Sequence, residues 1–271
     1  MGIGIGFCHQ PRFAMDGQWA RWAMGALVLF CLGAGAVSPD VLRVGAFSTQ
    51  DPSQETPDDW APISFSDIDM RTRYDLVRVD SSVVVRARSE GGAAGLATKR
   101  RVDLTEYPIL EWRWKVDGIV EDGNARTKEG DDYPARIYVT FDYEDLGFVD
   151  RAKLTALRAL GYDEIPTRAL NYIWANRVPQ GAFLENAYTD WVVMVAVRSG
   201  EQHAGRWVTE RRNVLQDYRA AFGGDPPPVN GIAIMTDTDN TNGEATAYYG
   251  DIVFRTAPDT MGATNALSTG R

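Results

Sequence analysis

The feature that most constrains the fold is a strict alternation of apolar and charged residues in short segments. In LEWRWKV, residues 110–116, the apolar positions are Leu110, Trp112, Trp114 and Val116, and the charged positions are Glu111, Arg113 and Lys115. RIYVTFD, residues 136–142, repeats the pattern. Because successive side chains of a strand point to opposite faces, a period of two predicts strands with one face in a core.

Other segments extend this pattern. VVVRAR at residues 83–88 and NYIWAN at residues 171–176 also alternate. WVVMVAV at 191–197 and GIAIM at 231–235 are apolar on both sides. Such runs are typical of central strands that are covered on both faces.

Two segments have helical spacing instead. RAKLTALRAL, residues 151–160, follows the candidate N-cap Asp150, and residues 209–224 end in two glycines followed by three prolines. Many strands and two helices predict an all-β-dominated fold. We expect an antiparallel, jelly-roll-like β-sandwich with two peripheral helices.

The N-terminal region has the pattern of a secretory signal. Arg21 precedes the apolar run WAMGALVLFCLGAGAV, which ends in the A-x-A sequence Ala34-Gly35-Ala36. The run is short for a membrane span of roughly 20 apolar residues. We expect a signal peptide at residues 1–36, with Met15 as an alternative start, and therefore a periplasmic or secreted protein without a membrane span after cleavage.

The remaining chain, about 235 residues, is long enough for one domain. We expect a linker or extended arm at 37–62, a single β-sandwich domain at 63–256 and a disordered tail at 257–271.

Composition excludes several functions for the part that follows the leader. Both cysteines, Cys8 and Cys31, lie in the leader, which excludes a disulfide or a thiol nucleophile. His203 is the one remaining histidine, so multi-His zinc sites are excluded. The formal net charge of −9 becomes −10 without the leader, and this acidity argues against nonspecific binding of nucleic acid.

An oxygen-rich stretch, DTDNTNGE, interrupts two apolar runs near the C-terminus. Asp237, Asp239 and Thr241 match the first three ligand positions of an EF-hand loop, but later positions do not match, and the flanks predict strands. One interpretation is a hairpin loop that caps its own backbone. A second is a structural calcium site formed by Asp237, Asp239 and Asp251, or completed by Glu244. A third is a sugar-binding or catalytic loop.

Two further groups are candidates. Asp131 and Asp132 are adjacent carboxylates followed by Arg136, a pattern that fits acid/base chemistry, metal binding or a solvated turn. Trp112 and Trp114 share a face with apolar residues, which predicts core packing. Trp174 shares a face with Tyr172 and Asn176, which fits either a core residue or an exposed platform.

The polar sides of the predicted strands form one larger set. Its members are Arg86, Arg88, Glu111, Arg113, Lys115, Arg136, Tyr138, Asp142, Trp174 and Asn176. Five positive and two negative charges give this set a formal charge of +3. If these strands are neighbours in one sheet, the surface suits an acidic polysaccharide; otherwise, it is an ordinary solvated face.

Several long strings resemble one bacterial family of unknown function, number 3047. They are YPILEWRWKVDG, GDDYPARIYVTFD, YIWAN, TERRNVLQDYRAAFG and GIAIMTDTDNTNGEATAYYGDIVF. The resemblance runs from Ile63 to Phe254 and implies exported proteins with a β-sandwich and no assigned activity. AYYGDIVF is also similar to the last strand of jelly-roll carbohydrate-binding modules.

We therefore expect an exported protein that binds a glycan or cell-envelope ligand without cleaving it. The candidate ligand-binding residues are Arg113, Arg136, Tyr138, Trp174, Asn176, Asp131 and Asp132. Calcium would be a structural cofactor, and an acidic polysaccharide or envelope component the partner; the oligomeric state is not predicted.

Two alternatives stay open. The first is an enzyme on a jelly roll. As a lyase it would use Tyr138 as acid/base and Arg136 or Asn176 to neutralise a uronate, and as a hydrolase it would use carboxylates among Asp131, Asp132 and Asp237. The second is a structural envelope protein.

Overall fold

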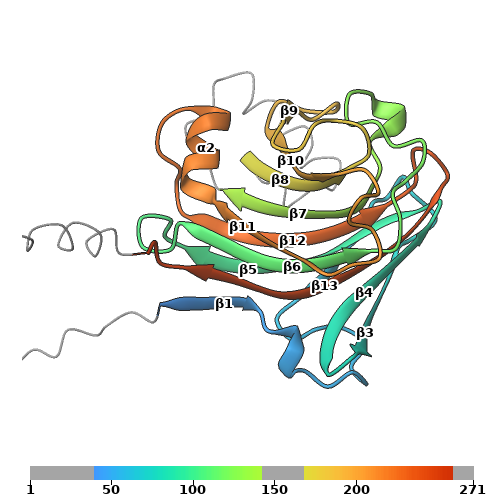
Figure 1. Cartoon of the computed structure of the whole chain (residues 1–271), viewed down its shortest axis with the longest axis horizontal. Helices are drawn as coiled ribbons and strands as arrows, with labels where there is room; N and C mark the ends of the chain where they lie inside the picture. The colour runs from blue at the N-terminus through green and yellow to red at the C-terminus, as the bar shows by residue number, and fades with distance from the viewer. Residues whose placement is uncertain (1–39, 142–167, 259–271) are drawn as a thin grey trace, which may run out of the picture. The chain divides into compact units, whose positions relative to one another are not determined.

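The computed structural model describes residues 40–141 and 168–258, all within one compact unit, Pro39–Arg271. These residues are mostly β, arranged in two sheets (Figure 1). Within this described part, no helix is long and apolar enough to cross a membrane.

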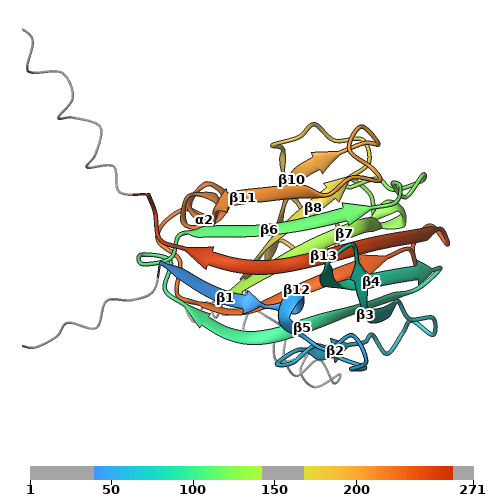
Figure 2. The same cartoon turned by 60° about the horizontal axis from the view of Figure 1, so that its bottom comes forward.

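The first sheet is antiparallel throughout. Its order is β11 (Val208–Asn213), β6 (Ile109–Val116), β13 (Glu244–Arg255), β4 (Ser82–Glu90) and β3 (Arg73–Val79), and β1 (Val41–Gly45) also pairs with β13. Figure 2 shows β6, β13 and β4 side by side. The central strand β13 therefore has β6 on one side and β4 or β1 on the other.

The second sheet contains one parallel pair. Its order is β2 (Ala61–Ile63), β5 (Ala93–Val102), β12 (Val229–Asp237), β7 (Tyr133–Phe141), β8 (Arg168–Ala175), β10 (Val192–Ser199) and β9 (Phe183–Glu185). Strands β8 and β10 are parallel, and the other neighbours are antiparallel. This pair departs from the expected fully antiparallel fold, and the jelly-roll connection order stays a prediction.

Aromatic side chains join the two sheets. Trp112 and Trp114 on β6 contact Tyr172 and Trp174 on β8, with ring centroids 5.4 and 5.8 Å apart respectively. All four rings are buried. The predicted core packing of Trp112 and Trp114 is thus confirmed, because the apolar side of LEWRWKV faces the second sheet.

One of the two predicted helices begins later than expected. The segment Val208–Asn213 continues as strand β11, and only Val214–Phe222 forms helix α2. The Asn213 side chain accepts a hydrogen bond from the Gln216 backbone and caps the helix, which ends at Gly223 with a φ of 71°. The other predicted helix, at residues 151–160, lies outside the described residues.

The expected linker contains ordered elements. Strands β1 and β2 lie between residues 37 and 63, together with the short 3-10 helix η1 (Phe47–Thr49). Phe47 and Trp60 are buried with ring centroids 5.3 Å apart. Part of this segment is therefore an extended arm that pairs with the sheets. A second 3-10 helix, η2 (Lys128–Gly130), precedes β7.

Candidate functional site

The strand order separates the residues that the alternation had grouped into one polar surface. Strands β4 and β6, which contain Arg86 and Arg113, belong to the first sheet. Strands β7 and β8, which contain Arg136 and Trp174, belong to the second sheet. The condition for a single surface is not met, and two separate polar regions result.

The first region is a row of side chains on the outer face of the first sheet. Tyr248 on β13 pairs with Arg86 on β4 and with Lys115 on β6. The next residues along these strands, such as Tyr249 and Trp114, are buried in the core, so the row faces outward. We name this row, together with Arg113 and Trp207, the basic aromatic stripe.

Cations lie over the rings of this stripe. The Lys115 ammonium is 4.2 Å from the centroid of the Tyr248 ring, and the Arg113 guanidinium is 4.8 Å from that of Trp207. The two rings meet edge to face, with centroids 6.4 Å apart. Each cation–π contact contributes about 0.5–1 kcal/mol at such partly exposed sites.

A glycine permits the position of Arg113. A Cβ at Gly250 would lie 2.5 Å from Cγ and Nε of Arg113. With no side chain there, Arg113 of β6 reaches across β13 and donates a hydrogen bond of 2.9 Å to the Ser82 hydroxyl on β4. The absence of a side chain at Gly250 therefore leaves room for the Arg113 side chain to lie against β13.

The charged groups of the stripe remain accessible. The side chains of Arg86 and Lys115 are 29% and 20% exposed. Asp75 on the edge strand β3 pairs with Arg86 at 3.1 Å and with Arg88 at 3.3 Å. Asp117 pairs with Lys115 at 3.8 Å. The four cations Arg86, Arg88, Arg113 and Lys115 outnumber these two partner carboxylates, so the group is locally basic on an acidic chain.

The second region is an acidic cluster at one end of the second sheet, where β7 begins and β12 ends. Arg136 is 3% exposed; its guanidinium lies 3.6 Å from the Asp131 carboxylate and forms an ion pair with Asp237. The Tyr133 hydroxyl donates to Asp131 at 2.9 Å. Arg136 is therefore enclosed by its own partners.

Asp132 and Asp239 complete this cluster. One carboxylate oxygen from each of Asp132, Asp237 and Asp239 lies within 4.8 Å of the others. Asp132 also accepts hydrogen bonds from the backbones of Asn240, at 3.2 Å, and Thr241, at 2.7 Å. Burial and the neighbouring Asp132 raise the pKa of Asp239 above its ordinary value. A buried trio of this kind has the ligand chemistry of a metal site.

The metal ligands expected from the sequence need one correction. Asp251 lies on β13 of the first sheet and accepts hydrogen bonds from the Ser48 backbone and hydroxyl, at 2.8 and 2.6 Å. Glu244 is exposed at the start of β13, opposite Glu90. Neither belongs to the trio, whereas Asp132, expected in a ligand-binding pair, does.

Two candidate ligand-binding residues have structural roles instead. Trp174 is fully buried, and its indole donates to the Gly200 carbonyl at 3.1 Å, so it offers no face to a ligand. The Asn176 amide donates to the carbonyls of Val120, Glu121 and Gly123 at 2.7–3.1 Å. These contacts hold a loop and correct the expectation of a binding surface around β8.

Tyr138 and Arg136 bear on the lyase alternative. Tyr138 is partly buried, and burial raises the pKa of its hydroxyl above the ordinary value. Its ring is 5.8 Å from the Arg136 guanidinium. Because Arg136 already pairs with two carboxylates, it is not available to neutralise a uronate.

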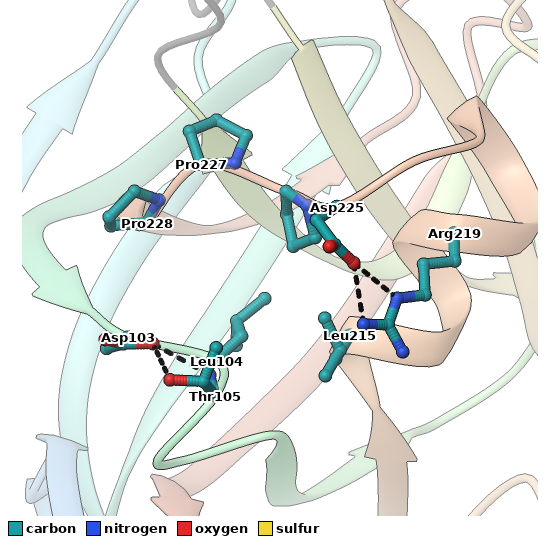
Figure 3. A pocket seen from close by; sticks show the side chains of 9 residues that line it. Asp103, Leu104, Thr105, Leu215, Arg219, Asp225, Pro227 and Pro228 are labelled. Atoms are coloured by element: carbon teal, nitrogen blue, oxygen red, sulfur yellow. Dashed lines mark hydrogen bonds and ion pairs between the residues drawn. The ribbon is translucent and has the colours of Figure 1, made fainter.

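The charged side chains that line a pocket beside helix α2 contact other residues of its lining (Figure 3). Its lining includes Asp103, Thr105, Arg219, Asp225 and Pro228. Arg219 pairs with Asp225 at 2.6 Å, and Asp103 accepts from Thr105 at 2.7 Å. The polar groups satisfy one another, so this pocket is not our candidate site.

Sequence reasoning missed two residues of the stripe, Tyr248 and Trp207, and the role of the adjacent Gly250. Tyr248 had a usable signal, because it alternates with the buried Tyr249. Trp207 lies just before β11, and nothing in its local sequence places it next to Tyr248. Gly250 is required because the Arg113 side chain of the neighbouring strand β6 lies over it, and no local pattern in the sequence shows this contact.

Fold and sites together define a two-sheet β-domain with a basic outer face and an acidic cluster at the end of the other sheet. The chain belongs to the family described as Protein of unknown function (DUF3047), which it matches over residues 58–253. This confirms the resemblance seen in the sequence. A search of curated proteins finds no significant match.

Solved structures give a distant likeness. The K2 adhesin domain of Lys-gingipain is 11% identical, with 79% of this chain and 98% of that chain covered and a TM-score of 0.37. The K1 adhesin domain of Lys-gingipain from Porphyromonas gingivalis W83 is 10% identical, with 80% and 99% covered and a TM-score of 0.34. The carbohydrate recognition domain of Emp47p is 10% identical, with 81% and 96% covered and a TM-score of 0.36. At these scores, no functional argument rests on them.

Proposed function

We propose that this is an exported, non-catalytic protein that binds an acidic polysaccharide of the cell envelope along the basic aromatic stripe. The observation that carries the proposal is the row of Arg86, Tyr248, Lys115 and Trp207, with Arg113 beside it, on the outer face of three adjacent strands. A solvated sheet face does not require two aromatic rings held by cations.

The chemistry of the stripe matches an anionic sugar polymer. Guanidinium groups form charge-assisted hydrogen bonds with carboxylates and sulfates, and an aromatic ring offers a flat apolar face to a sugar ring. Two strand spacings of about 4.8 Å make the stripe about 10 Å long from β4 to β6, before Trp207 is added. A polymer lying across the strands would therefore meet several contacts.

The proposed contact requires neither catalysis nor a metal. The residues of the stripe are cations and aromatics, without the carboxylate pair that a hydrolase uses. The acidic trio belongs to the other sheet and its loop. Calcium is therefore not part of the ligand contact that we propose.

Affinity electrophoresis in EDTA tests this function. We expect polygalacturonate or dextran sulfate in the gel to slow the protein, and neutral dextran to leave its mobility unchanged. Added salt should weaken the retardation, because exposed charges are screened over about 10 Å at 0.1 M. Equal retardation by neutral dextran, or none by either acidic polymer, would contradict the proposal.

Variants locate the contact. Trp207→Ala should lower the affinity about 2- to 10-fold, as expected for a ring contact worth about 0.5–1.5 kcal/mol. Lys115→Gln should also weaken binding, whereas Arg219→Gln removes one charge beside helix α2 and serves as the matched control. Binding reduced equally by both glutamine variants would indicate net charge rather than the stripe. Digested polymer around the band would favour the enzyme alternative.

A further inference from the structure

The acidic cluster has more negative charge than its protein partners balance. Asp131, Asp132, Asp237 and Asp239 contribute four carboxylates, and of the described residues only Arg136 forms an ion pair with them. The formal charge is −3. Asp131, Asp132 and Asp237 are at most 5% exposed. Burying uncompensated charge is costly, so this cluster requires a further positive charge.

Two oxygens in the cluster lack the hydrogen bonds that buried polar atoms normally have. One is Oδ1 of Asp237, a residue that is 1% exposed, and the other is the hydroxyl of Thr241. Neither has a partner within the part of the chain that the structure describes. Thr241 lies at the cluster, because its backbone donates to Asp132 at 2.7 Å. Unsatisfied buried oxygens of this kind call for a ligand.

We propose that Asp132, Asp237 and Asp239, with the Thr241 hydroxyl, bind a divalent cation of the calcium type. The cation attaches the β12–β13 loop to the start of β7. This site goes beyond the proposed function, since it lies on the other sheet and is independent of any polysaccharide.

The donor atoms favour calcium over other metals. All are oxygens, three are from carboxylates, and two of the four residues lie on an irregular loop. Calcium accepts six to eight oxygens in flexible geometry, whereas magnesium demands a near-ideal octahedron and zinc prefers nitrogen and sulfur. Asp237, Asp239 and Thr241 occupy alternate positions of one segment, and Asp132 supplies a ligand from a second segment, just before β7.

The same loop is already linked to its surroundings. The Asn240 amide donates to the Tyr188 hydroxyl at 2.9 Å, and that hydroxyl donates to the Lys128 carbonyl at 3.2 Å. Tyr188 is 54% exposed. A cation at the trio would thus order three segments that are distant in sequence.

The test is calcium titration of the full chain after EDTA treatment and dialysis, followed by calorimetry and thermal unfolding. We expect a saturable heat of binding. We also expect a rise in Tm of about 5–10 °C when calcium is 100-fold above its Kd. A matched ionic strength of sodium chloride should not reproduce it. The absence of both binding heat and a Tm rise would overturn the proposal.

Three variants make the test specific. Asp239→Asn should keep or raise the Tm in EDTA, because it removes like-charge repulsion, and should lose most of the calcium response. Thr241→Val keeps the backbone contact to Asp132 and should bind calcium at least several-fold more weakly. Asp251→Asn, at the position expected from the sequence alone, should respond as the original protein does. A full calcium response in Asp239→Asn, or its loss in Asp251→Asn alone, would refute the site.

Discussion

Arg136→Met should be among the most destabilising single changes on the outer side of the second sheet. This residue is 3% exposed, and its guanidinium pairs with Asp131 and Asp237 and lies 4.8 Å from the centroid of the Tyr133 ring. Methionine has similar length and apolar character, so the change removes the charge and leaves most of the volume. The cluster then contains four carboxylates without their cation.

The magnitude follows from the burial of this network. Removing one partner of a buried ion pair typically costs about 3–5 kcal/mol, because the remaining charge stays buried and unpaired. With a urea m-value of about 1–3 kcal/mol/M, the unfolding midpoint should fall by at least about 1 M. The same substitution at Arg219, whose pair with Asp225 is exposed, should cost at most about 1 kcal/mol.

Urea unfolding in EDTA, followed by tryptophan fluorescence, measures these costs. A double-mutant cycle with Asp237→Asn should give a coupling energy of about 0.5–3 kcal/mol, since the two side chains contact each other directly. A loss below about 1 kcal/mol for Arg136→Met, or strict additivity in the cycle, would refute the role of Arg136 as the buried counter-ion of these carboxylates.

Three further predictions separate structural from binding residues. Asn176→Ala removes the hydrogen bonds from this amide to three loop carbonyls and should lower the unfolding free energy by about 1–3 kcal/mol. At a temperature where the variant is folded, its retardation by the acidic polysaccharide should be unchanged. Trp174→Ala, which opens a cavity against Trp114, should cost about 3–5 kcal/mol in urea unfolding, and a loss below 1 kcal/mol would show that the indole is not a core residue. Gly250→Ala should displace Arg113 from the sheet face and weaken retardation several-fold, with a small change in Tm; unchanged affinity would mean that the position of this guanidinium is unimportant.

Local features of the sequence determined the strands and their inward faces. The alternation in Leu110–Val116 is sufficient to place Trp112 and Trp114 in the core, since neighbouring side chains of a strand must point to opposite faces. The glycines at the end of residues 209–224 likewise mark the end of helix α2. The predicted start of this helix is wrong, because Val208–Asn213 pairs with β6 and this pairing overrides the helical propensity of the segment.

The sites depended on features that no local pattern contains. Asp251 follows the oxygen-rich stretch by seven residues. The pairing of β13 is irregular between Tyr249 and Ile252, and Asp251 bonds to Ser48 in place of joining Asp237. Alternation alone does not predict such an irregularity, so the expected metal set included a residue from another face.

The sequence by itself determined that the alternating segments form strands, that Trp112 and Trp114 are buried, and that acidic residues gather before and after apolar runs. Only the tertiary structure decided that Asp132 meets a loop 108 residues further along the chain, and that Trp207 lies beside Tyr248. The physical reason is that strand order is set by the packing of whole faces against each other. A local pattern fixes which way a side chain points, but not which strand lies next to it.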